Sequence, residues 1–165
     1  MFEYFDVDTE PVTFDLGAKG DFSDIVSMWQ ERLKGQDIPS WSDFKLPDFS
    51  GWVPTMAMSE VSECRSDIRF RLFGSAMVSL QGKDLTGSSF RETLPGPYDA
   101  IYRNHFARFL EKPQIALGFP SASSTLDKPH LMAVVHLPLA DDGHTIDRIL
   151  HFARLVPLYI EEADT

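Results

Sequence analysis

Residues 68–87 read IRFRLFGSAMVSLQGKDLTG, and the pattern of this stretch changes at its glycines. Apolar and polar side chains alternate before Gly74, which is typical of a half-buried strand. One face of this strand is expected to carry Ile68, Phe70 and Leu72. The following residues, 75–80, predict a short helix that Gly82 ends. The stretch therefore predicts a strand, a short helix and a turn.

The residues before this stretch add a second strand and a helix. Residues 53–61 also alternate and are joined to the first strand by a polar turn, which predicts a hairpin. An amphipathic helix is expected further upstream, with Asp21 or Ser23 as its cap, because Phe22, Ile25, Val26, Trp29 and Leu33 form one stripe. Residues 36–52 contain four aromatic side chains that should pin them to the body, with Ser40 or Ser42 capping one helical turn. Residues 1–20 show no period and are expected to be an irregular arm, with a short extended piece near Val12 to Leu16.

The residues after the stretch 68–87 predict one long helix and three further strands. A helical stripe from Tyr98 to Phe109 ends before Pro113. Strands are expected at 114–119, 131–139 and 146–156, the last two joined by a tight turn at Asp142-Gly143. Hairpins at both ends with helices between them do not fit a parallel, doubly wound sheet. The order predicts an α+β fold with a five-stranded antiparallel sheet crossed by helices.

The expected domain organisation is one domain with flanking segments. An arm (1–20) precedes a helical cap with the aromatic segment (21–52), a core (53–157) and an acidic tail (158–165). A chain of 165 residues is long enough for one buried core. We expect no effector domain in it, so that a signal would leave through a partner bound in trans.

Composition restricts the classes of partner and the cellular compartment that we expect for this chain. The formal net charge is -10, which disfavours nucleic acid and anionic membranes as partners. No apolar run is long enough to span a bilayer, and the acidic N-terminus does not resemble a secretory signal. One cysteine excludes an internal disulfide and fits a reducing compartment, so we expect a cytoplasmic protein.

The sequence carries none of the common catalytic motifs. It has no nucleophile elbow, no P-loop, no dinucleotide-binding glycine motif and no zinc-protease motif. We therefore expect no enzyme and no metal site.

Both faces of the last hairpin are largely apolar, so both should be covered. The tight turn would pair His136 with Ile149 and place His136 and His151 on one face as diagonal neighbours. A metal or a pH switch between the two histidines is one interpretation, and two ordinary half-buried histidines are the other. The central helices should cover one face; the N-terminal helix, a second subunit or both should cover the other. We assign this interaction surface to Trp29, Met132, Val134, His136, Ile149 and His151.

Several stretches resemble a bacterial subfamily of the PAS fold with a helical N-terminal cap. Residues 70–78 and the Gly-x-Asp-Leu-Thr-Gly turn at 82–87 resemble its strand, short helix and turn. Residues 137–143 resemble its last hairpin, and the upstream Trp29, Pro39, Trp41 and Asp43-Phe44 resemble its helical N-terminal cap. Together these pieces cover about residues 22–157. The resemblance implies a sensing and protein-docking domain, usually dimeric, with no fixed catalytic residues and no universal cofactor.

A ligand pocket is expected between the second strand and the long helix. Its candidate lining is Phe70, Leu72, Met77, Tyr102, His105, Phe106 and Phe109. Such a lining suits a small apolar ligand, but it is also what a core filled by side chains looks like, and the filled core is the preferred interpretation. Three functions stay open: a non-catalytic signalling domain, a carrier of haem or an apolar metabolite with His105 as axial ligand, and a small isomerase or dehydratase using Tyr102 and His105.

Overall fold

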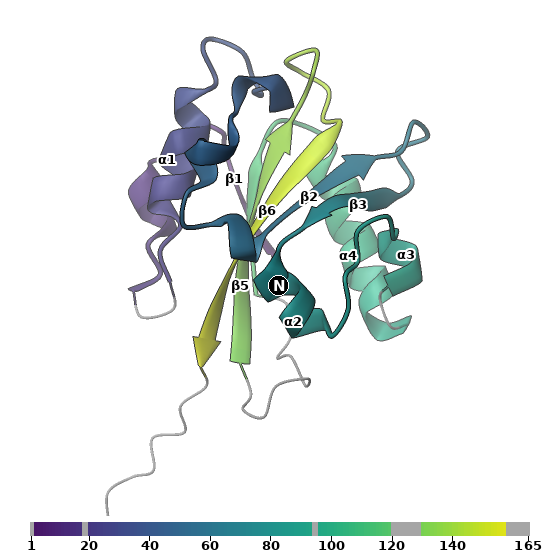
Figure 1. Cartoon of the computed structure of the whole chain (residues 1–165). Helices are drawn as coiled ribbons and strands as arrows, with labels where there is room; N and C mark the ends of the chain where they lie inside the picture. The colour runs from purple at the N-terminus through teal and green to yellow at the C-terminus, as the bar shows by residue number, and fades with distance from the viewer. Residues whose placement is uncertain (1, 18–19, 94–95, 120–129, 158–165) are drawn as a thin grey trace, which may run out of the picture.

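An antiparallel sheet of six strands lies between two layers of helices in the computed structural model (Figure 1). The structure describes residues 2–17, 20–93, 96–119 and 130–157. The strands are β1 (Phe2–Phe5), β2 (Met56–Val61), β3 (Ile68–Phe73), β4 (Ile115–Gly118), β5 (His130–Leu139) and β6 (Arg148–Pro157), in the spatial order β1-β4-β5-β6-β2-β3. The helices are α1 (Ser23–Glu31), α2 (Ser75–Gln81), α3 (Phe90–Thr93) and α4 (Gly96–Phe109). Among the described residues, no helix has the length and apolar character needed to cross a bilayer. The α+β class is confirmed, with one strand more than predicted.

The additional strand comes from the segment predicted to be an irregular arm. Phe2 pairs with Gly118 and Phe5 with Ile115, so β1 extends the sheet beyond β4. Gly118 makes this pairing possible, because a side chain there would collide with the Phe2 ring. A strand of four residues is too short for a period-two pattern to stand out. The extended piece expected near Val12 is instead a single 3-10 turn, Pro11–Phe14.

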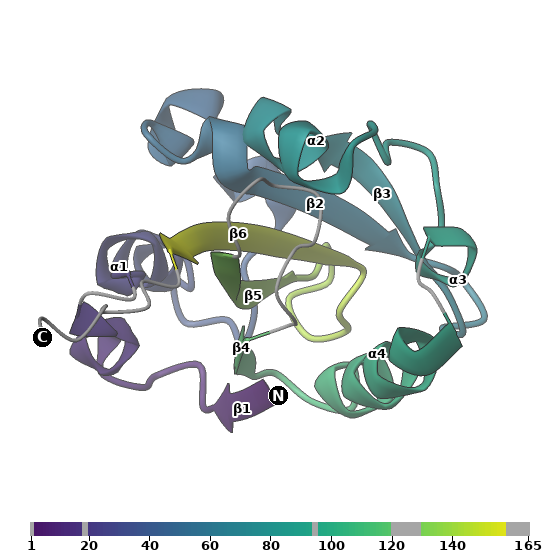
Figure 2. The ribbon, with the colours of Figure 1, turned by 90° about the horizontal axis from the view of Figure 1, so that it is seen from below.

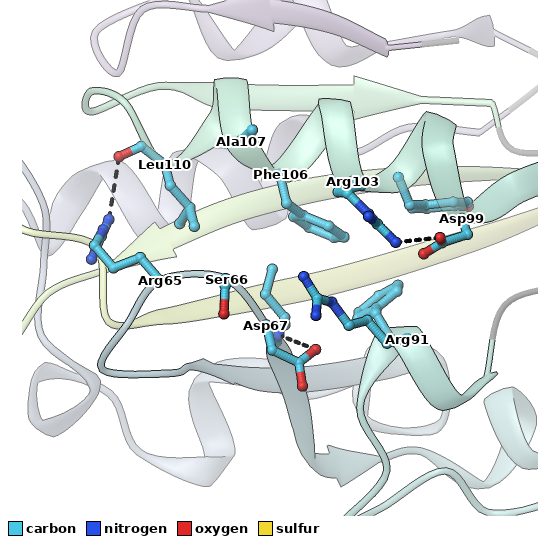
Figure 3. A pocket seen from close by; sticks show the side chains of 12 residues that line it. Arg65, Ser66, Asp67, Arg91, Asp99, Arg103, Phe106, Ala107 and Leu110 are labelled. Atoms are coloured by element: carbon cyan, nitrogen blue, oxygen red, sulfur yellow. Dashed lines mark hydrogen bonds and ion pairs between the residues drawn. The ribbon is translucent and has the colours of Figure 1, made fainter.

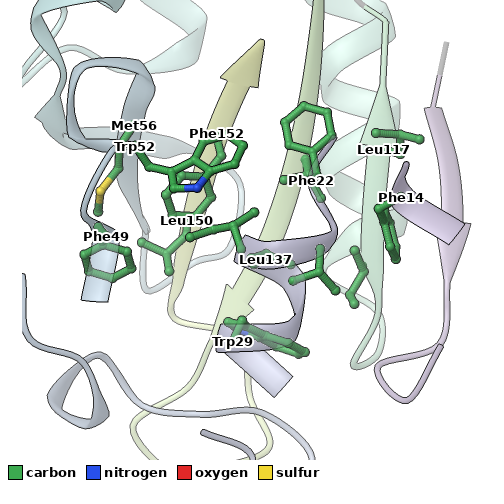
Figure 4. Packing of buried hydrophobic residues seen from close by; sticks show 14 of the residues in the cluster. Phe14, Phe22, Trp29, Phe49, Trp52, Met56, Leu117, Leu137, Leu150 and Phe152 are labelled. Carbon is green, nitrogen blue, oxygen red and sulfur yellow. The ribbon is translucent and has the colours of Figure 1, made fainter. Parts of the chain in front are cut away.

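The layer formed by α1 covers one face of the sheet (Figure 4). The predicted stripe is confirmed in α1, where Ile25, Val26 and Trp29 are buried. The Trp29 indole N–H donates a hydrogen bond of 3.0 Å to the carbonyl oxygen of Pro138. Phe22 precedes the helix and provides no side-chain cap, while the Asp21 carboxylate accepts the Ser23 backbone N–H at 2.8 Å. The helix therefore covers the sheet within the chain.

The aromatic-rich segment belongs to the same layer. It forms two 3-10 turns, Trp41–Asp43 and Leu46–Phe49, and a third, Val53–Thr55, follows it directly. Ser40 caps the first of them in a reciprocal arrangement with Asp43, as predicted. The buried aromatic side chains of the segment are Phe44, Phe49 and Trp52. The last turn replaces the start of the strand that was expected from Val53.

The opposite face of the sheet is covered by α2, α3 and α4 (Figure 2). Phe106 and Phe109 of α4 pack with Ile149 of β6. Met77 and Leu80 of α2 pack with Ala153 further along β6. Gly82 ends α2 in the left-handed conformation, with φ +78°, as its position after the helical stretch predicted. Both faces of the β5–β6 hairpin are thus covered within one chain.

A β-bulge in β3 changes the predicted face of Leu72. Met58 pairs with Leu72, but its neighbour Ser59 pairs with Phe70, so Arg71 is an extra residue. A bulge of this kind shifts the alternation by one residue. Ile68 and Phe70 therefore face α3 and α4, whereas Leu72 packs into the cluster beneath α1. The prediction that all three share a face was wrong for Leu72.

The β5–β6 hairpin has a longer loop than the predicted two-residue turn. Leu139 pairs with Arg148, which leaves residues 140–147 in the loop. The Asp142 carboxylate accepts the backbone N–H groups of His144 and Thr145, at 2.8 and 2.7 Å. The carbonyl of Gly143 accepts the Ile38 N–H at 3.1 Å, which ties the loop to the preceding segment. The pairing of β5 with β6 therefore differs from the predicted pairing by two residues. This shift leaves every side chain on its predicted face and places His136 directly opposite His151.

Candidate functional site

A cavity of about 80 Å³ lies between the sheet and the helices that cover its second face. We call it the inner cavity. Its walls come from β2, β3, α2, α3, α4, β5 and β6, and most of them are apolar. The lining residues are Ala57, Phe70, Phe73, Met77, Gln81, Leu85, Phe90, Thr93, Tyr102, Met132, Val134, His136 and His151. An apolar wall with a few converging polar groups is typical of a small-molecule site, and the volume restricts a ligand to a few heavy atoms, because it lies well below the usual range of about 300–1,000 Å³.

Three of the predicted pocket residues line the inner cavity: Phe70, Met77 and Tyr102. Leu72 lies on the other face of the sheet because of the bulge. The remaining predicted pocket residues, His105, Phe106 and Phe109, are buried beside the cavity without lining it. The spacing of the α4 stripe located the right helix, but it did not separate the side chains that line a cavity from those that fill a core.

The residues predicted as an interaction surface lie inside the chain. Val134, His136, Ile149 and His151 are at most 5% exposed, and Met132 is half-buried against α2. Trp29 is fully buried on the opposite face, so it does not belong with this group. The sequence predicted correctly that both faces need a cover: the central helices α2, α3 and α4 cover one face, and the N-terminal helix α1, one of the predicted covers, lies on the other.

Hydrogen bonds and one ring contact, buried or partly buried, connect the edge strand β1 with the sheet beneath α4. The Tyr4 hydroxyl is 2.7 Å from Nδ1 of His105. Nε2 of His105 is 2.9 Å from Nδ1 of His136. The His136 and His151 rings lie edge to face with centroids 4.6 Å apart, and Nε2 of His151 is 2.7 Å from the Ser59 hydroxyl. We call these five residues the histidine chain.

Burial keeps the imidazoles of the histidine chain neutral. It lowers the pKa of His105 to about 2, with the neighbouring His136 as a smaller cause. It lowers the pKa of His136 to about 3 and holds the pKa of His151 well below its usual range. Burial also raises the pKa of Tyr4, against the effect of the Arg108 guanidinium, which lies 4.0 Å from the centre of the Tyr4 ring. The histidine chain therefore consists of uncharged hydrogen-bond donors and acceptors.

Two members of the histidine chain reach the inner cavity, since His136 and His151 line it. A polar atom of a bound molecule could accept or donate a hydrogen bond there, because a neutral imidazole has one donor and one acceptor. His105 holds hydrogen-bond partners at both ring nitrogens, so ligation of a haem iron would require the loss of one of them. Among the described residues, no group of three or more histidine, cysteine or acidic side chains is arranged to hold a metal ion.

Sequence reasoning did not identify Tyr4 and Ser59 as site residues. Tyr4 lies in a segment without a visible period, and its role depends on a contact with a residue 101 positions away. Ser59 did carry a signal in the sequence, because it is a hydroxyl residue after an apolar run in β2. In the structure it is fully buried. A buried hydroxyl needs a partner, and His151 supplies it.

Comparison with known families agrees with this geometry. A family model described as PAS domain matches residues 20–153. No curated protein gives a significant match to the chain. The matched range contains the inner cavity and the histidines that line it, whereas β1 lies before its first residue.

Proposed function

This chain belongs to the PAS domain family, and on that premise we propose that it is a non-catalytic signalling domain that binds a small apolar ligand and acts on a protein partner in trans. PAS domains are generally sensory and non-catalytic. The observation that carries the proposal is the inner cavity, whose apolar wall is completed by the neutral imidazoles of His136 and His151. We place the protein in the cytoplasm, in keeping with a single cysteine and an acidic composition.

The proposed signal passes from the inner cavity to β1 through the histidine chain. His136 lines the cavity, bonds to His105 and thereby connects to Tyr4 on β1. A ligand that forms a hydrogen bond with His136 competes with the hydrogen bond between His105 and His136, or it fixes the tautomer of His136. The stability of β1 pairing would then depend on whether the cavity is occupied.

β1 is also a suitable place for docking a partner. It is an edge strand, and edge strands present unpaired backbone groups to other chains. The edge at β3 is partly covered, because Phe70 exchanges backbone hydrogen bonds with Gly87 and Ser88. The partner is a protein, with a second copy of this chain as the alternative that light scattering would reveal.

Filling the inner cavity tests the proposal. Met77→Trp adds bulk at the cavity wall and is expected to cost about 1–3 kcal/mol while the fold survives. Leu80→Trp is the matched control, because Leu80 lies in the same cluster as Met77 but does not line the cavity. Pull-down from a cell extract should show altered partner capture with Met77→Trp and parental capture with Leu80→Trp.

Two results would contradict the proposal. Equal capture by both variants and the parent would mean that the cavity has no role in docking. A parent protein that retains no partner but turns over a small carbonyl substrate would instead favour an enzyme.

A further inference from the structure

A second hollow, which we call the outer groove, shares lining residues with the inner cavity, and Figure 3 shows the side chains that line it. It has a volume of about 250 Å³ and lies between α3, α4 and the turn that precedes β3. Phe90 and Tyr102 line both spaces, and their ring centroids are 5.8 Å apart. The outer groove and the inner cavity are therefore neighbouring spaces that share aromatic side chains in their linings.

The floor of the outer groove is apolar. Ile68 and Phe106 are buried at its base, at 3% and 6% exposure. Leu110 and the exposed Ala107 continue the floor along α4. A ligand body that covers this floor would remove apolar surface from water, which favours binding.

The rim of the outer groove is cationic, although the whole chain has a formal charge of -10. Three arginines and two aspartates line it, which leaves one positive charge in excess. Arg65 donates to the backbone carbonyls of Ile146 and Leu110, and Arg103 pairs with Asp99. Arg91 forms no ion pair or hydrogen bond within the described part of the chain, and Figure 3 shows it extending over the groove.

Charge and size together indicate the occupant. A guanidinium presents paired N–H donors that match a carboxylate, and the one positive charge in excess on the rim matches one negative charge. Twelve residues line the groove, fewer than the 20–30 that a protein partner usually contacts on each side. The volume lies just below the usual range for small-molecule sites, about 300–1,000 Å³.

We propose that the outer groove binds a small amphipathic monocarboxylate, with its carboxylate on Arg91 and its apolar body along Phe106, Ala107 and Leu110. This site is independent of the ligand proposed for the inner cavity. Octanoate is a suitable probe, and octanol, which has the same tail without the charge, is its neutral counterpart.

Amide NMR titration of the whole chain tests the site. Octanoate should shift the amide signals of Ala107 and Leu110, and octanol should bind there at least about tenfold more weakly. Arg91→Gln should weaken octanoate binding by a similar factor. Lys83→Gln is the matched control: it removes the same charge from an exposed residue that does not line the groove, and it should leave the affinity unchanged.

A second variant tests the floor without changing the charge. Ala107→Trp fills the groove from an exposed helix position, so the fold should survive and octanoate binding should be lost. Equal binding of octanol and octanoate, or equal effects of Arg91→Gln and Lys83→Gln, would overturn the proposal. Shifts confined to Ala57, Met77 and Ala153 would place octanoate in the inner cavity; that result overturns the outer site and leaves the proposed function standing.

Discussion

Acidification should destabilise this protein strongly, because the imidazoles of His105, His136 and His151 are buried in their neutral form. Burial lowers the pKa of each imidazole far below the ordinary value of 6.5. The pKa is about 2 for His105 and about 3 for His136. The unfolded chain binds protons on these groups near pH 6.5, whereas the native chain does not. Their contribution to stability is therefore complete above pH 6.5 and is lost progressively as the pH falls below it.

The expected magnitude is large compared with the stability of a domain. Each buried imidazole loses about 1.4 kcal/mol per pH unit below its unfolded pKa. For His105, His136 and His151 together, the loss by about pH 5.5 is about 4 kcal/mol, within a total stability of about 5–15 kcal/mol. Most carboxyl groups stay ionised in this range, so the histidines should dominate the slope.

Urea denaturation at several pH values between about 7.5 and 5.5 measures this slope as the change in the free energy of unfolding. His151→Gln should reduce the slope by about one third, because one buried imidazole of three is removed. His144→Gln is the matched control, since His144 is exposed and the variant removes no buried imidazole. A parent protein whose free energy of unfolding is flat over this range would refute the claim that the histidines are buried and neutral.

Three substitutions test the packing. Phe70→Ala should cost about 3–5 kcal/mol in denaturant melts, because Phe70 is 6% exposed and packs on the Phe90 ring with centroids 4.8 Å apart; a loss under about 1 kcal/mol would contradict its place in β3. Trp29→Asp buries a carboxylate and leaves the carbonyl of Pro138 without its donor, so thermal melts and light scattering should show unfolding or aggregation; parental behaviour would mean that α1 does not cover the sheet. Tyr4→Phe should cost about 1 kcal/mol and speed amide exchange in β1 but not in α1, whereas unchanged exchange in β1 would show that the hydroxyl does not hold the strand.

Side-chain period and glycine positions were enough to predict most elements of the fold. The α1 stripe, the strand–helix stretch ending at Gly82 and the long helix α4 all appear where the periods placed them. These elements are long or end at a residue with a clear backbone preference, so local sequence determines them. The same reasoning identified Phe70, Met77 and Tyr102, which do line a cavity.

The remaining differences come from contacts between distant parts of the chain. The bulge at Arg71 follows from the pairing of β2 with β3, and an alternating sequence gives no sign of it. The loop after Leu139 is held by Asp142 and by docking on Ile38, which outweighs the preference of Asp-Gly for a tight turn. β1 depends on a glycine in β4, more than 110 residues away, that admits the Phe2 ring.

The central claim is that the inner cavity holds a small ligand that the domain senses. Native mass spectrometry of freshly purified protein tests it most directly, with the parent, Met77→Trp and Leu80→Trp compared under identical conditions. We expect an additional small mass on the parent and on Leu80→Trp that disappears on denaturation and is absent from Met77→Trp. A parent that shows only the mass of the polypeptide, as Met77→Trp is expected to do, would contradict it.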